Sequence, residues 1–167
     1  MPVESNKTTK QIIILTALTI FLLIIDQVSK AFVRAHVTLG EYIPILSKYL
    51  GITYSQNTGA AFGIFSDGTV ILTVISTTMA VFCLWLFFNT RKVSQLNNIW
   101  GRLSLSLLFT GAVGNLIDRL FLGFVTDWIK LPPIPNFNVA DSCITIAVVV
   151  IIVFIFLPMI FKKNDHA

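Results

Sequence analysis

The sequence has few charged residues. Asp, Glu, Lys and Arg make up 12% of the 167 residues, whereas 55% are hydrophobic and the mean hydropathy is +0.83. A soluble domain carries about 25% charged residues, so this composition excludes a cytosolic globular domain and a disordered chain. Long apolar segments in such a chain are typical of membrane spans of about 20 residues. The sequence therefore predicts a single membrane domain with room for about four spans.

Residues that bind metals or form nucleophilic triads are also scarce. Cys83 and Cys143 lie in apolar runs, and the two histidines, His36 and His166, show no metal-ligand spacing. Neither a His-Glu-x-x-His nor a Gly-x-Ser-x-Gly motif occurs in the sequence. We therefore expect no metal and no cofactor, which leaves carboxylates as the groups that could carry chemistry.

Four apolar segments have the length of a membrane-spanning helix, at residues 11–33, 69–89, 99–121 and 139–161. The first could be a cleavable signal peptide, because Lys7 and Lys10 precede it. However, Asp26 and Lys30 stand where a small-residue cleavage site would follow. The sequence therefore favours an uncleaved first span.

The basic residues lie asymmetrically about these segments. Seven of the 12 Lys and Arg belong to the N-terminus, the connection between the second and third spans, and the C-terminus, whereas six of the eight Asp and Glu belong to the other side. The positive-inside rule then places both termini in the cytoplasm. Because the 12 basic residues are scattered around apolar segments, the net charge of +4 indicates membrane-flanking charge and not nucleic-acid binding.

The two outer connections, residues 34–68 and 122–138, differ in pattern. Residues 41–55 alternate apolar and polar side chains, which predicts short strands or a small hairpin on the outer membrane surface. Residues 57–63 are rich in small side chains and favour a closely packed turn. The second connection contains Pro132, Pro133 and Pro135, which exclude a continuous helix.

Polar residues stand at the outer ends of the first and third spans. Asp26 and Lys30 have the i, i+4 spacing of a helical ion pair, and Lys30 could extend outward to the membrane surface. Asn115, Asp118 and Arg119 share one helical face, next to Gly111 and Gly114, which permit close approach of another helix. These clusters could be structural clamps, parts of an active site, or both.

Two further acids, Asp127 and Asp141, are each flanked by apolar residues, a setting that raises the pKa of a carboxyl group. Asp127 could also be a surface loop acid, and Asp141 a first-turn acid favoured by the helix dipole. Two carboxyl groups that share one proton can act together as base and acid on a scissile amide. Asp118 is the other candidate for the first acid, but the Arg119 guanidinium would hold it ionised, so we favour Asp127.

Five short motifs follow one another along the chain: residues 26–30 (DQVSK), 57–62 (NTGAAF), 111–119 (GAVGNLIDR), 125–127 (VTD) and 137–141 (FNVAD). Together with the four spans they resemble the bacterial lipoprotein signal peptidases, or type II signal peptidases. The chain differs from that pattern at Thr126, where the family commonly has a hydrophobic residue, and in its short proline-rich segment between the two acids.

This resemblance implies an all-α integral membrane protein of four transmembrane helices, with a small extracytoplasmic β-like cradle, an outer loop and a short periplasmic helix. It implies an aspartic endopeptidase of the bacterial cell membrane that cleaves diacylglyceryl-modified prolipoproteins on the N-terminal side of the lipidated cysteine. Asp127 and Asp141 match the catalytic dyad of the family. The residues that match its substrate groove are Asn57, Gly59, Asn115, Arg119, Asn138 and Ala140, and those that match a supporting polar cluster are Asp26, Lys30 and Asp118.

The expected partners are prolipoprotein substrates and membrane lipid, with the protein acting as a monomer. A small proton-coupled transporter is the main alternative, and it predicts acids spread across the depth of the membrane. Here the acids gather on one side. A purely structural membrane subunit would not need so many outer polar groups, so we favour the enzyme.

Overall fold

The computed structural model describes residues 2–59 and 68–164, with side chains described from 8 to 59 and from 68 to 161. Helix α1 is longer than the expected first span at both ends. The helices are α1 (Pro2–His36), α2 (Gly68–Phe88), α3 (Ile99–Leu122), and α4 (Val139–Ile151), which continues through η4 (Ile152–Phe156) into α5 (Leu157–Asn164). Four of these helical stretches are long and apolar enough to cross a membrane, which confirms the predicted four-helix membrane fold.

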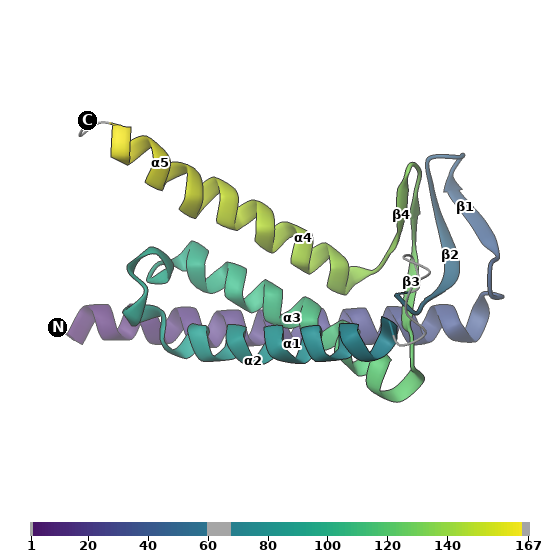
Figure 1. Ribbon diagram of the computed structural model, residues 1–167, viewed down its shortest axis with the longest axis horizontal. Coiled ribbons are helices and arrows are strands. Elements are labelled where there is room, and N and C mark those ends of the chain that lie inside the picture. The colour runs from purple at the N-terminus through teal and green to yellow at the C-terminus, as the bar shows by residue number, and fades with distance from the viewer. Residues whose placement is uncertain (1, 60–67, 165–167) are drawn as a thin grey trace.

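Helix α3 is the central helix. Half of its apolar segment is buried, against 11% for α1 and 17% for both α2 and α4, and it contacts each of the other three. The segment from α4 to α5 diverges from the other helices along its length (Figure 1). Both ends of the chain and the connection between α2 and α3 lie at one end of the bundle, the terminal end, and the β-sheet lies at the other, the sheet end (Figure 1).

Local sequence signals set the helix boundaries. Asn98 caps α3, its side chain accepting a hydrogen bond from the Gly101 N–H at 2.9 Å, and Gly123 ends the helix in the left-handed region with φ +80°. The connection between α2 and α3 contains two short 3-10 helices, η2 (Thr90–Lys92) and η3 (Ser94–Leu96). Pro158 lacks the N–H that a regular helix needs, and a π-helical turn, η4, ends two residues before it.

The outer connections form one antiparallel sheet in the order β1-β2-β3-β4, from β1 (Tyr42–Leu46), β2 (Leu50–Asn57), β3 (Val125–Leu131) and β4 (Ile134–Phe137). The hairpin expected within residues 41–55 is confirmed as β1 and β2. The second connection is a hairpin as well, and β2 pairs with β3 to join the two. Residues 37–59 and 123–138 contain no helix, and the rest of the expected turn at 57–63, from residue 60 onward, lies outside the described residues.

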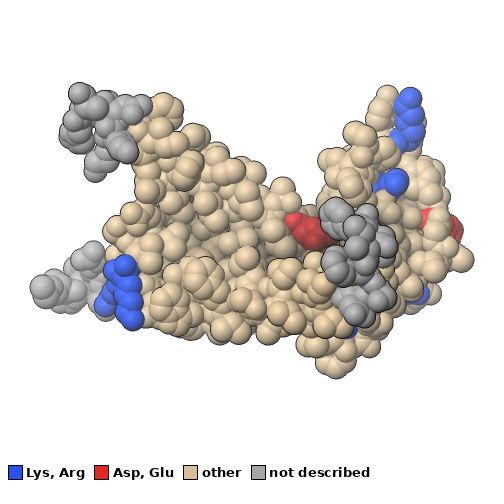
Figure 2. Space-filling model, in the orientation of Figure 1, with Lys and Arg blue, Asp and Glu red and all other residues tan. Residues whose placement is uncertain are grey.

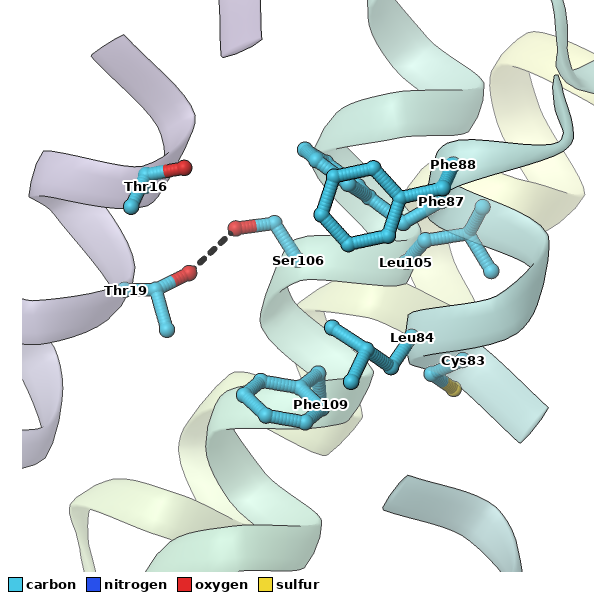
Figure 3. Close-up of a pocket in the computed structure, with 9 residues that line it drawn as sticks. All are labelled: Thr16, Thr19, Cys83, Leu84, Phe87, Phe88, Leu105, Ser106 and Phe109. Atoms are coloured by element: carbon cyan, nitrogen blue, oxygen red, sulfur yellow. Dashed lines mark hydrogen bonds between the residues drawn. The ribbon is translucent and has the colours of Figure 1, made fainter. Parts of the chain in front are cut away.

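An apolar pocket of about 150 Å³ lies between α1, α2 and α3 toward the terminal end, and we call it the inner pocket. Figure 3 shows Phe87, Phe88 and Phe109 at this pocket, with Thr16 and Thr19 of α1 opposite them. Its walls contain one hydroxyl pair, Thr19 Oγ1 and Ser106 Oγ, 2.6 Å apart. Apart from Ser106, the buried side chains around it are apolar, among them Cys83, Leu86 and Leu105.

Candidate active site

Asp127 and Asp141 reach the same place from two different elements. Asp127 is the third residue of β3 and Asp141 lies in the first turn of α4. Asn138, the N-cap of α4, connects them: its Nδ2 donates to Asp127 Oδ1 at 2.8 Å, and its Oδ1 accepts from the Asp141 N–H at 2.9 Å. Its own N–H also donates to Asp141 Oδ2 at 3.2 Å, which completes a capping box. One asparagine therefore fixes both carboxyl groups.

The other carboxylate oxygens also accept hydrogen bonds from amides. Asn57 Nδ2 donates to Asp127 Oδ2 at 3.0 Å, and Asn115 Nδ2 donates to Asp141 Oδ1 at 2.7 Å. Each of the four oxygens thus has a donor, and each keeps a second lone pair for water or a proton. The amides orient the two acids and leave their outer lone pairs available for chemistry.

The surroundings of Asp127 raise its proton affinity. The side chain is 3% exposed, and burial raises the pKa of Asp127 to about 6, with the charge of Asp141 adding to the increase. The hydrogen bonds from Asn57 and Asn138 and the positive charge of Lys30 act in the opposite direction. A carboxyl group with a pKa near 6 can both take up and release a proton close to neutral pH.

Lys30 fixes the amide of Asn115. Its Nζ donates to Asn115 Oδ1 at 3.0 Å, and because an ammonium group only donates, the amide nitrogen of Asn115 must face Asp141. Lys30 also forms the predicted ion pair with Asp26, at 2.8 Å, and lies 3.5 Å from Asp118 Oδ2. Its side chain is fully buried, so the expectation that Lys30 could extend outward is wrong. Two carboxylates compensate the buried cation inside the bundle.

Asp26 connects α1 to the start of α4. Its Oδ1 accepts a hydrogen bond from the Ala140 N–H at 2.9 Å, which satisfies a backbone donor in the first turn of α4. The helices approach closely here because Gly114 has no side chain: a Cβ atom on Gly114 would lie 2.7 Å from Asp26 Oδ2 and 3.0 Å from the Ala140 Cβ. A side chain on Gly111 would likewise meet Ile144 of α4, so the close approach predicted from these glycines is confirmed.

Asp118 and Arg119 differ from expectation. The guanidinium near Asp118 belongs to Arg34, with Nη1 3.8 Å from Asp118 Oδ1, and Arg119 instead donates to Ser76 Oγ of α2 at 3.1 Å. The expected pairing of Asp118 with Arg119 is wrong because neighbouring helical residues point about 100° apart, and here they face α1 and α2 respectively. Asp118 Oδ2 also accepts the Thr126 N–H at 2.8 Å.

Asn57 and Gly59 form a turn directly after β2. The Gly59 N–H donates to Asn57 Oδ1 at 2.9 Å, which leaves the amide nitrogen of Asn57 to face Asp127. Gly59 has φ +76°, and a Cβ atom there would collide with the Leu72 side chain of α2. The backbone at this position therefore requires glycine.

The structure thus gathers most of the sequence-predicted site residues at the junction of α1, α3, α4 and the sheet: Asp26, Lys30, Asn57, Asn115, Asp118, Asp127, Asn138, Ala140 and Asp141. Figure 2 shows an acidic surface in the hollow between the helices and the sheet. Within residues 2–59 and 68–164, no cluster of His, Cys, Asp or Glu could hold a metal ion.

Sequence reasoning missed four side chains of this network. Arg34 contacts Asp118 and Thr126, Gln27 donates to Asp26 at 3.0 Å, and Ser76 accepts from Arg119. Arg34 could have been found, because it follows Lys30 by four residues on the same face of α1. The contacts of Thr126 and Ser76 depend on how distant segments pack, and no local pattern indicates them.

Comparisons with known proteins decide the family. The family model described as signal peptidase (SPase) II matches residues 18–157. The chain belongs to the signal peptidase II family. It is 38% identical to the lipoprotein signal peptidase of Dehalococcoides mccartyi strain 195, covering 85% of this chain and 84% of that protein. It is 39% identical to that of Fusobacterium nucleatum, covering 81% and 82%, and 34% identical to that of Streptococcus pyogenes serotype M5, covering 88% and 92%.

Solved structures agree with this family. Two bacterial membrane enzymes, solved by the in meso method at 1.9 and 2.3 Å resolution, each match with a TM-score of 0.75. The first is 32% identical and covers 83% of this chain and 90% of its own length, and the second is 30% identical and covers 92% and 91%. Signal peptidase II membership indicates a multi-pass bacterial membrane protease that processes the signal peptides of prolipoproteins.

Proposed function

We propose that this protein is an aspartic endopeptidase that removes the signal peptide from diacylglyceryl-modified prolipoproteins, on the N-terminal side of the lipidated cysteine. The observation that carries the proposal is the bridge that Asn138 forms between the buried Asp127 and the partly buried Asp141, next to the sheet. Two such groups cannot both ionise cheaply, so together they hold one proton at the working pH.

The reaction follows from this shared proton. The ionised carboxylate takes a proton from water, whose oxygen attacks the carbonyl carbon of the scissile amide, while the protonated carboxyl group donates to the carbonyl oxygen. When the tetrahedral intermediate collapses, the C–N bond breaks and a carboxyl proton passes to the leaving amine of the lipidated cysteine. The dyad then again holds one proton.

Asn115 and Asn138 support this chemistry by orienting the acids. Their amide nitrogens hold Asp141 and Asp127, and their amide oxygens accept from Lys30 and from the Asp141 N–H. Gly59 and Arg119 face α2, and Asn57 contacts Asp127, so an extended substrate would enter here, between the sheet and the helices. Ala140 leaves the space that the close contact of α3 and α4 requires.

The orientation is part of the proposal. A substrate with two acyl chains stays in the bilayer, so its cleavage site lies near a membrane surface. By their positions in the sequence, seven of the 12 Lys and Arg belong to the terminal side, and six of the eight Asp and Glu belong to the other side. The positive-inside rule therefore supports cytoplasmic termini, an extracytoplasmic sheet and an active site near the outer surface.

The test is cleavage of a diacylglyceryl prolipoprotein by purified protein in lipid, with product masses measured. We expect cleavage before the lipidated cysteine, nearly complete loss in Asp141→Asn, and no effect of EDTA. Folding of the variant, checked by its unfolding in detergent, serves as the control. Inactivation by EDTA that added zinc restores would contradict the proposal.

A further inference from the structure

The backbone of Thr126, directly before Asp127, forms hydrogen bonds to groups outside the sheet. Side chains alternate between the two faces of a strand, so Val125 and Asp127 face the carboxylate site and Thr126 faces the opposite side, toward α1. Thr126 is fully buried. The Thr126 side chain can therefore affect the carboxylate site only through the backbone that joins it to Asp127.

Three groups of Thr126 make hydrogen bonds to three different elements. Its N–H donates to Asp118 Oδ2 of α3 at 2.8 Å, and its carbonyl oxygen accepts from Asn138 Nδ2 at 3.3 Å. Its hydroxyl oxygen accepts from Arg34 Nη1 of α1 at 2.9 Å. The first two bonds use backbone groups that any residue would supply, whereas the third depends on a hydroxyl side chain here.

Arg34 connects this hydroxyl to the rest of the polar network. It follows Asp26 by eight residues and Lys30 by four, so the three side chains share one face of α1. Arg34 Nη1 also lies 3.8 Å from Asp118 Oδ1, and a quarter of the side chain is exposed. A single guanidinium thus reaches both Asp118, which holds the Thr126 N–H, and the Thr126 hydroxyl.

We propose that Arg34 and Thr126 form a positioning pair that fixes the backbone of Asp127 for catalysis. This inference rests on the proposed function, because it assigns the pair a role through Asp127. Neither side chain faces the dyad. The pair therefore acts on the catalytic step, and substrate binding does not depend on it.

The test measures kcat and KM separately for Thr126→Val, which keeps the shape and backbone of the residue and removes the hydroxyl. A small displacement of a catalytic group lowers the rate steeply, so we expect kcat to fall about 10- to 100-fold while KM stays within about twofold. Thr126→Ser keeps the hydroxyl and should restore most of the rate. Arg34→Met should reproduce the defect, and the double variant should fall no further than Thr126→Val alone.

Thr53→Val is the matched control. Thr53 is a buried threonine of the same sheet whose hydroxyl donates to the Glu41 carbonyl oxygen at 2.7 Å, away from Asp127. We expect it to leave kcat unchanged. Wild-type kcat in Thr126→Val, a change in KM alone, or equal losses in Thr126→Val and Thr53→Val would overturn the positioning role. Asp127→Asn in the same assay separates the two claims, because cleavage by that variant would overturn the proposed function itself.

Discussion

At the sheet end of the bundle, the helices bury charged side chains that bond to one another: Asp26 and Lys30 of α1 and Asp118 of α3 are at most 1% exposed. Toward the terminal end, the same helices surround the inner pocket with apolar side chains and one hydroxyl pair. The buried charge there, Arg102, bonds to the neutral amide oxygens of Gln11 and Asn97, both at 2.7 Å. Apolar contacts, together with these few hydrogen bonds to neutral groups, hold α1, α2 and α3 together there.

This difference bears on function. An ionisable group inside a membrane segment costs several kcal/mol unless it is paired, so a network of such groups is retained for more than packing. The packing at the terminal end indicates that the helices can assemble without a network of paired ionisable groups. The charges at the sheet end instead orient the amides that hold Asp127 and Asp141.

The largest stability effect is expected from Lys30→Met. Removing the ammonium group leaves Asp26 and Asp118 buried without their shared cation, so the free energy of unfolding should fall by about 3–5 kcal/mol. Unfolding in mixed micelles measures it. Lys10→Met is the matched control, since Lys10 is an exposed lysine of the same helix, and its effect should stay below about 0.5 kcal/mol. Equal losses of unfolding free energy in both variants would contradict the difference between the sheet end and the terminal end.

The pH dependence of stability should show the burial of Asp127. The pKa of Asp127 is raised from 3.8 to about 6, so the folded protein binds this proton more tightly than the unfolded chain. Its contribution is fully present below about pH 4 and is lost as pH rises through 6, by at most about 3 kcal/mol. Unfolding measured from pH 4 to 7 should show this loss, and Asp127→Asn should remove most of it. An unchanged slope in the variant would contradict the raised pKa.

The smallest effect is expected at the inner pocket. Replacing Thr19 by Val and Ser106 by Ala removes both partners of the hydroxyl pair, so no buried donor is left unpaired there, and stability should change by about 1 kcal/mol or less. Cleavage should stay at the wild-type rate. A variant that folds normally and loses cleavage would show that the inner pocket takes part in catalysis.

Much of the fold could be predicted from local patterns. Apolar length indicated the four helices, alternation indicated the β1–β2 hairpin, and the i, i+4 spacing indicated the Asp26–Lys30 ion pair. These features depend on residues close together in the chain. The pairing of β2 with β3 does not, because it joins segments about 70 residues apart, and nothing in either segment specifies the partner.

The same limit applies to the site. Its acids could be proposed from their apolar surroundings and the family resemblance, and their geometry comes from contacts between distant segments. Asn138 reaches Asp127 only because the β3–β4 hairpin turns back to α4, and Arg119 faces Ser76 because α2 packs on that side of α3. The direction of a side chain across a helix interface can be predicted only once the packing of the helices is known. For this reason the expected pairing of Asp118 with Arg119 was wrong.

The central claim is that Asp127, and not the neighbouring buried acid Asp118, performs the chemistry with Asp141. Its most direct test compares cleavage of a diacylglyceryl prolipoprotein by Asp127→Asn and Asp118→Asn, each purified and shown to be folded. Asp118 contacts Lys30, Arg34 and the Thr126 N–H, so its replacement should slow cleavage and weaken folding while measurable product still forms. Asp127→Asn should form essentially none. Cleavage by folded Asp127→Asn, with none by Asp118→Asn, would contradict the assignment of the dyad.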